Sequence, residues 1–212
     1  LGHRRIACIT GPLKISLSRE RLKGFQAALS EDGVELPPAR LYEGDFRFPS
    51  GVRGIAIAGK PTDAVIIGLY ALDLRPDLVV SGINIGENLS FESIMTSGTV
   101  GAALEAANQG TPAIAFSLQV EDQGEKFDDP RRYGKGFARA KEVVWEITGE
   151  VLRRGFPEDA DVINVNIPSR IRGGYEVTRL ARKLFHTGVE ERLDPRKRPY
   201  YWINGPLVED AD

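Results

Sequence analysis

Two glycine-rich polar blocks hold the residues with the best chemistry for binding a ligand. The first block spans residues 81–88 and directly follows a short apolar run. Such a run is typical of a buried parallel strand, and open α/β sheets bind ligands beyond the carboxyl ends of their strands. Gly82 and Gly86 would let the backbone approach a ligand closely. Asn84 and Asn88 would offer neutral oxygens to a hard metal ion or a hydroxyl. We therefore predict that Gly82, Gly86 and Asn88 line a substrate crevice.

The second block spans residues 97–103 and predicts the start of a helix made of small residues. A helix start presents backbone N–H groups that have no partner inside the helix, and these groups attract anions. Two hydroxyl groups, on Ser97 and Thr99, flank Gly98 at this point. The pattern is that of a phosphate site at Ser97, Gly98 and Thr99. A glycine-rich turn followed by an ordinary helix cap explains the same residues, and both interpretations stay open at this stage.

The elements that would position these blocks alternate along the chain. We expect strands at residues 5–10, 39–43, 54–58, 77–81, 113–118 and 162–165, and helices at 16–30, from Pro61, at 98–109 and at 132–154. This alternation predicts an α/β fold with right-handed crossovers and a mostly parallel sheet between two helical layers. A polar, acidic stretch at residues 119–130 predicts a surface loop. From residue 173 the β-prone stretches 175–180, 185–190 and 200–203 predict a C-terminal β-hairpin extension.

Composition limits the class of protein. The chain has 212 residues, 28 basic and 30 acidic, so its net charge is −2 and no basic face for nucleic acid is expected. The cluster from Arg192 to Arg198 is best explained as a solvated loop. No apolar run approaches the roughly 20 residues of a membrane span, the first residues do not resemble a signal peptide, and the single cysteine, Cys8, fits a reducing compartment. We expect a cytoplasmic protein that binds neither nucleic acid nor membrane.

Several motifs in the right order resemble the SurE (stationary-phase survival) 5′-nucleotidases over residues 52–212. The motifs are Gly59-Lys60-Pro61-Thr62-Asp63, Pro76-Asp77-Leu78-Val79-Val80-Ser81-Gly82-Ile83-Asn84, Ser97-Gly98-Thr99-Val100-Gly101-Ala102-Ala103, Gly110-Thr111-Pro112-Ala113-Ile114-Ala115, Asn164-Val165-Asn166-Ile167-Pro168 and Tyr200-Tyr201-Trp202. The resemblance implies a Rossmann-like three-layer α/β/α fold and a phosphomonoesterase that acts on nucleoside monophosphates with Mg²⁺ or Mn²⁺. It implies that Asn84 is a metal ligand and that Ser97, Gly98 and Thr99 hold the phosphate. It also implies a dimer or tetramer, which we expect to form through residues 173–203, and a final β segment that this chain lacks.

The first strand departs from that family. Members of the family carry Asn-Asp-Asp-Gly at its end, whereas this chain has Thr10-Gly11-Pro12, and no carboxylate precedes Glu20. The loop expected to hold a metal-binding serine is also unrecognisable. Asp45 and Asp63 are the remaining acidic candidates, but a turn or a helix start explains each more simply. Because a divalent ion needs anionic oxygen, we expect weak metal binding and little or no activity.

Residues 1–51 resemble a different family, the effector-binding domain of LacI-type repressors. Residues 1–7, 10–13, 18–25 and 43–46 carry this resemblance, which makes Arg21 a possible effector contact. We therefore interpret the chain as an engineered chimera in which a LacI-like β-α-β unit precedes a SurE-like body. A unit of about 50 residues cannot bury a sheet face alone, so one cooperative domain is expected. A non-catalytic scaffold or a module that binds a sugar or nucleotide is the alternative function.

Overall fold

The structure is a computed structural model that describes residues 7–10, 45–47, 53–57, 59–119, 134–206 and 208. The expected helix at 16–30, the expected strand at 39–43, nearly all of the expected loop at 119–130 and the candidate Arg21 lie outside these residues. The chain forms two compact units. The first comprises residues 1–87 and 98–171, and the second comprises residues 88–97 and 172–212. Whether the chain unfolds as one cooperative domain stays a prediction.

A parallel sheet of three strands, in the order β4-β5-β6, forms the centre of the first unit. The strands are β4 (Val79–Ile85), β5 (Ala113–Leu118) and β6 (Val162–Ile167). Strand β5 has the predicted bounds and all six of its residues are buried, as expected for the middle strand of such a sheet. Strand β4 continues through Ile85, so the prediction of a loop directly after Ser81 was wrong. A bulge keeps the glycine of this stretch within the strand.

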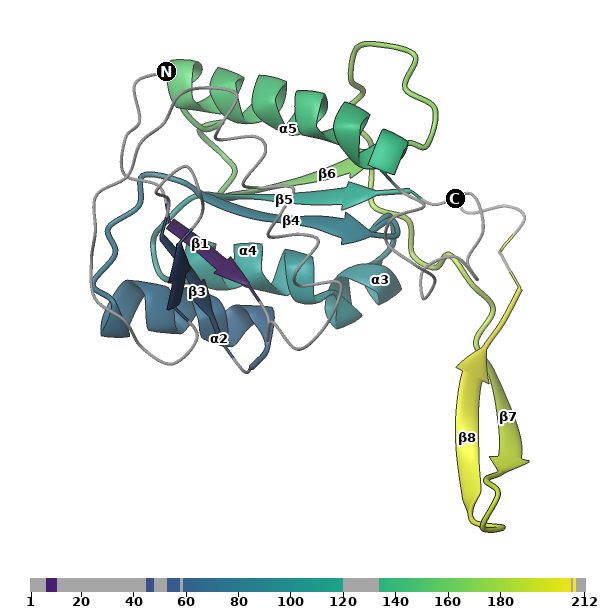
Figure 1. The fold of residues 1–212 in the computed structure, drawn as a ribbon. Coiled ribbons are helices and arrows are strands. Elements are labelled where there is room, and N and C mark those ends of the chain that lie inside the picture. Colours follow the sequence, from purple (N-terminus) through teal and green to yellow (C-terminus); the bar gives the residue numbers. More distant parts are fainter. Residues whose placement is uncertain are drawn as a thin grey trace. The chain divides into compact units, whose positions relative to one another are not determined.

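Helix α5 (Gly134–Arg154) covers one face of this sheet, shown in green in Figure 1. Its apolar residues recur every three or four positions, which places them on one side of the helix. They pack on side chains that alternate along β5 and β6. The resulting hydrophobic core contains Ile114, Phe116, Leu118, Ala140 and Ile167, with Phe137, Val144, Ile147 and Val151 packed against it.

Helices α4 (Gly98–Asn108) and α2 (Pro61–Ile66) pack together, and α4 covers the opposite face of the sheet (Figure 1). Helix α2 continues into a single wide turn, η1 (Ile67–Ala71), in which Leu69 is buried. Small residues make the close packing of α4 possible, since Ala103 and Ala106 are fully buried, as are Ala113 and Ala115 of β5. The arrangement confirms an α/β fold with a mostly parallel sheet between helices.

A second small sheet precedes α2. Strand β1 (Ala7–Thr10) pairs in parallel with β3 (Arg53–Ala56), with Ala7 opposite Arg53 and Thr10 opposite Ala56. Both strands overlap the predicted stretches. Strand β2 (Asp45–Arg47), which the sequence did not predict, pairs antiparallel with β3.

The second unit contains helix α3 (Phe91–Thr96) and a hairpin of β7 (Gly188–Leu193) and β8 (Pro199–Asn204). The predicted hairpin is confirmed, but the stretch from Tyr175 to Leu180 forms no strand among the described residues. Its β-prone residues favour a strand, yet none of the described segments pairs with its backbone. The short helix α3 was not expected. Ser90 caps it, accepting a hydrogen bond from the backbone N–H of Ser93 at 3.2 Å.

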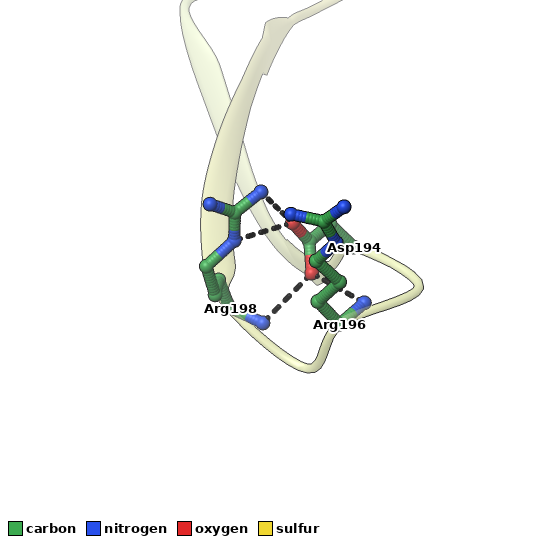
Figure 2. Close-up of polar contacts among 3 residues, drawn as sticks. All are labelled: Asp194, Arg196 and Arg198. Atoms are coloured by element: carbon green, nitrogen blue, oxygen red, sulfur yellow. Dashed lines mark hydrogen bonds and ion pairs between the residues drawn. The ribbon is translucent and has the colours of Figure 1, made fainter.

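The turn of the hairpin is organised by one carboxylate, that of Asp194 (Figure 2). Its Oδ1 accepts hydrogen bonds from the backbone N–H groups of Arg196 and Arg198, at 2.8 and 2.9 Å. Its Oδ2 accepts from Nε of Arg198 at 2.8 Å. These bonds hold the pKa of Asp194 below its usual value, chiefly through the backbone and side chain of Arg198. The basic cluster at residues 192–198 is therefore a structured turn.

The two faces of the hairpin differ in chemistry. On one face Arg192 lies beside Glu190, with Nε to Oε1 at 2.8 Å, and its guanidinium carbon is 5.7 Å from the centre of the Trp202 ring. The ion pair lowers the pKa of Glu190. The opposite face carries exposed apolar side chains, those of Val189, Leu193, Tyr201 and Ile203. We call this set the apolar hairpin face.

Candidate phosphate-binding site

A bulge in β4 determines which side chains this strand presents near its carboxyl end. Ser81 pairs with Ala115 and Asn84 pairs with Ser117, so three steps along β4 match two steps along β5. One extra residue reverses the alternation of side chains. Asn84 therefore lies on the same face of the sheet as Ser81, the face covered by α4, whereas Ile83 packs in the core beneath α5.

Gly82 makes this bulge possible. Its φ angle is +124°, and a β-carbon at this position would lie 2.5 Å from the backbone oxygen of Phe116. Any larger residue would clash with the backbone of β5, which cannot shift as the end of a flexible side chain could. Gly82 therefore allows a close approach to the neighbouring strand, and its predicted approach to a ligand stays a prediction.

The segment after the bulge is held to the end of β5. The N–H of Gly86 donates to the carbonyl of Leu118 at 2.7 Å. The side-chain amide of Asn84 donates through Nδ2 to the carbonyl of Gly86 at 2.8 Å. Because its nitrogen is engaged in this way, the carboxamide presents Oδ1 as the atom for a cation or a donor.

Helix α4 begins on the same face of the sheet. Oγ of Ser81 donates to the carbonyl oxygen of Thr99 at 2.8 Å, which connects β4 directly to the first turn of the helix. The first N–H groups of a helix carry a partial positive charge and face outward from its start. The candidates Gly98, Thr99, Asn84 and Gly82 thus lie in one region, at the carboxyl end of β4.

The start of α2 lies against the start of α4. A β-carbon at Gly98 would lie 2.9 Å from Cγ of Pro61, and one at Gly101 would lie 3.6 Å from Cγ2 of Thr62. Asp63 closes the first turn of α2, since its Oδ2 accepts from the backbone N–H of Lys60 at 2.6 Å. Asp63 is therefore a carboxylate at a helix start, which was the simpler alternative to a role as metal ligand.

The structure adds two side chains that the residue pattern did not single out. Ser117 of β5 pairs with Asn84 on one side and with Asn166 of β6 on the other. Residues paired in neighbouring parallel strands project to the same face. Since Val165 and Ile167 pack beneath α5, Asn166 lies on the α4 face together with Ser117. We call Asn84, Ser117 and Asn166 the polar row. Polar residues alternating with apolar ones in residues 162–167 were the available signal.

Two predicted site residues belong to the second unit. Ser97 has an extended backbone and donates its N–H to Ile94 at 3.2 Å, so it ends α3 and directly precedes Gly98 in the chain. Asn88 is 3% exposed. Their roles in phosphate binding and in the crevice stay predictions.

A divalent ion, implied by the family resemblance, does not fit the donors that the structure describes. Asn84 supplies one neutral oxygen. Within the described ranges there is no group of three or more His, Cys, Asp or Glu side chains that could hold a metal. Thr10, at the end of β1, stands where a carboxylate would be expected, and Asp45 belongs to β2, which pairs with β3. A neutral amide alone does not compensate for the dehydration of Mg²⁺ or Mn²⁺.

Comparison with known families decides which protein class this is. A family model described as "Survival protein SurE" matches residues 12–187. The chain belongs to the SurE family. Proteins named "5′-nucleotidase SurE" are 74% identical over 163 residues in Methanoculleus marisnigri and 76% identical over 157 residues in Methanoregula boonei. These alignments cover 77% and 74% of this chain. A crystal structure of a SurE protein from Aquifex aeolicus superposes with a TM-score of 0.62 at 26% identity, covering 94% of this chain and 81% of that chain.

The comparisons also concern residues 1–51 and the share of each relative's length that this chain covers. The SurE match begins at residue 12, inside the segment assigned above to a LacI-like unit, and so extends the SurE similarity into that segment. The aligned region spans 62% of the Methanoculleus protein and 60% of the Methanoregula protein. Among the described residues, no helix is both long and apolar enough to cross a bilayer.

Proposed function

We propose that this SurE-family chain binds the phosphate of a nucleoside monophosphate and is a phosphomonoesterase scaffold with weak or no turnover. The relatives named 5′-nucleotidase supply the substrate class. The observation that carries the proposal is the bond between Ser81 and the carbonyl of Thr99, which fixes the start of α4 over β4.

Binding follows from the geometry around that bond. Backbone N–H groups at Gly98 and Thr99 would donate to phosphate oxygens, and the partial charge of the helix start would favour the anion. Asn84 lies on the same face of the sheet as Ser81, and its side chain is oriented by its bond to Gly86. The carboxylate of Asp63 is engaged with the backbone N–H of Lys60.

Turnover requires more than binding. In such enzymes a metal ion neutralises charge on the transferring group and activates a water molecule. The donors among the described residues do not fit a divalent ion, and positioning of the phosphate by those residues supplies only part of the rate enhancement.

A phosphatase assay with excess Mn²⁺ tests this proposal. We expect the unmodified chain to hydrolyse nucleoside monophosphates at a rate near background while it still binds inorganic phosphate. The variant Thr10→Asn, Gly11→Asp, Pro12→Asp should bind Mn²⁺ more tightly and gain a trace of turnover. Substantial hydrolysis by the unmodified chain, abolished by EDTA and by Asn84→Ala, would contradict the lost metal site.

A non-catalytic binding module is the second candidate, favoured because the part of the chain that the structure describes holds no group of three or more His, Cys, Asp or Glu side chains that could bind a metal. Calorimetry separates it from the first candidate. A pure binding module would hold adenosine 5′-monophosphate without hydrolysing it in either the unmodified chain or the triple variant. An effector contact through Arg21 would add a sugar or purine preference that Arg21→Ala removes.

The proposal also covers the location of the protein, its assembly and the origin of residues 1–51. We propose a cytoplasmic homo-oligomer that assembles through residues 173–203, supported by the apolar hairpin face. The chimeric origin with a LacI-like unit at residues 1–51 stays a hypothesis. The SurE match from residue 12 is an observation against it.

A further inference from the structure

The polar row crosses the sheet at the end where a ligand would bind. Asn84, Ser117 and Asn166 come from three adjacent strands and are paired in register. Ser117, in the middle, is fully buried, whereas Asn84 and Asn166 at the two ends are partly exposed. The row thus offers two accessible carboxamides separated by a buried hydroxyl.

The α4 face becomes less polar away from this end. One step deeper, Ala115 lies between Ser81 and Asn164, and two steps deeper Ala113 lies between Val79 and Val162. Asn164 lies one step deeper than Asn166, opposite Ala115. The polar side chains therefore increase toward the carboxyl ends of the strands, as expected for a binding edge and not for a packing surface.

Distance decides what Asn166 can contact. The start of α4 is fixed over β4 by Ser81, and Asn166 lies two strands away. Neighbouring strands are about 4.8 Å apart, so this separation is about 10 Å. A hydrogen bond spans about 3 Å. Asn166 is therefore too far from a phosphate at Gly98 and Thr99 to bind it, and it lies where the remainder of a phosphorylated molecule would extend.

We infer that Asn166 binds the nucleoside portion of the ligand whose phosphate is held at the start of α4. A carboxamide both donates and accepts, which matches the hydroxyl groups of a ribose or the edge of a base. Pairing of β4 and β6 with the central strand β5 sets the spacing between the two carboxamides. This inference rests on the proposed function, because it assumes a phosphate at Gly98 and Thr99.

Calorimetric titration of Asn166→Ala with three probes tests the inference. The probes are inorganic phosphate, ribose 5-phosphate and adenosine 5′-monophosphate. We expect the affinity for adenosine 5′-monophosphate to fall about tenfold, equivalent to about 1.4 kcal/mol, while phosphate binding is unchanged. An equal loss with ribose 5-phosphate places the contact at the sugar, and no loss with that probe places it at the base.

The matched control is Asn164→Ala, the same substitution on the same strand and face, one step deeper in the sheet. It should change affinity for neither adenosine 5′-monophosphate nor phosphate. Three outcomes would overturn the inference: unchanged nucleotide affinity in Asn166→Ala, an equal loss of phosphate affinity in that variant, or the same nucleotide loss in Asn164→Ala. If the unmodified chain bound none of the probes, the proposed function itself would fail and the inference with it.

Discussion

Gly98 and Pro61 stand so close that a β-carbon on the glycine would lie 2.9 Å from Cγ of the proline and 3.2 Å from its Cδ. Each is the first residue of its helix, and the two helices meet at these residues. The proline ring is rigid, so it cannot rotate away as the end of a long side chain would. The close packing of α2 against α4 therefore requires glycine, which has no side chain, at position 98.

Gly98→Ala should push the two helix starts apart. We expect a loss of about 1–3 kcal/mol in the free energy of unfolding, as for other overpacked sites, and weaker phosphate binding. Urea denaturation and phosphate titration measure the two effects. Gly101→Ala is the control, because its β-carbon would be 3.6 Å from Thr62 and alanine favours helices. Equal stability of the two variants would refute the steric explanation.

Ser81→Ala should loosen the start of α4. The variant loses the bond from Oγ to the carbonyl of Thr99, which is worth about 1 kcal/mol of stability. Phosphate affinity should fall as well, since the helix start is less firmly positioned. Thr96→Ala removes an exposed hydroxyl that bonds to the carbonyl of Glu92 within α3 and should cost less. A phosphate affinity unaffected in Ser81→Ala would show that this bond does not organise the site.

The sequence predicted the fold more closely than the site, and β5 and β4 show why. Strand β5 is apolar except for Ser117, so its bounds can be predicted from burial. Strand β4 contains Gly82, which signals a turn unless the neighbouring strand is known, and only the register of β4 against β5 shows that the glycine lies in a bulge. The pairing of Asn166 with Ser117 could not be predicted from the sequence either, because the register between strands that are distant in the chain is set by the folded structure.

Acid should loosen the hairpin turn. The pKa of Asp194 is lowered by its bonds to Arg198, so this carboxylate stabilises the turn above its ordinary pKa of about 3.9. That contribution is lost as the pH falls through the lowered value. Amide chemical shifts of Arg196 and Arg198 should follow this titration, and Asp194→Asn should abolish it. Glu191→Gln, on the opposite face of β7 from the Glu190–Arg192 pair, should leave it in place. Persistence of the titration in Asp194→Asn would assign it to another group.

Charge on the apolar hairpin face should weaken self-association. Val189 and Ile203 are paired across the two strands and are 64% and 77% exposed. Replacing both with lysine places two like charges in the proposed interface, so light scattering should give a lower mass than for the unmodified chain. Asn204→Lys adds a charge to the other face of β8 and should not change the mass. An unmodified chain that is monomeric at high concentration would rule out this interface.

The alternation of apolar and polar residues along β6 affects how such a protein could change its ligand preference. Ile163, Val165 and Ile167 lie in the core beneath α5, while the two asparagines between them lie on the opposite face. The side chains that build the core and the side chain proposed to contact the ligand, that of Asn166, therefore occupy separate positions of one strand. A library randomised at position 166 alone would vary the proposed ligand contact while every member kept the same hydrophobic core.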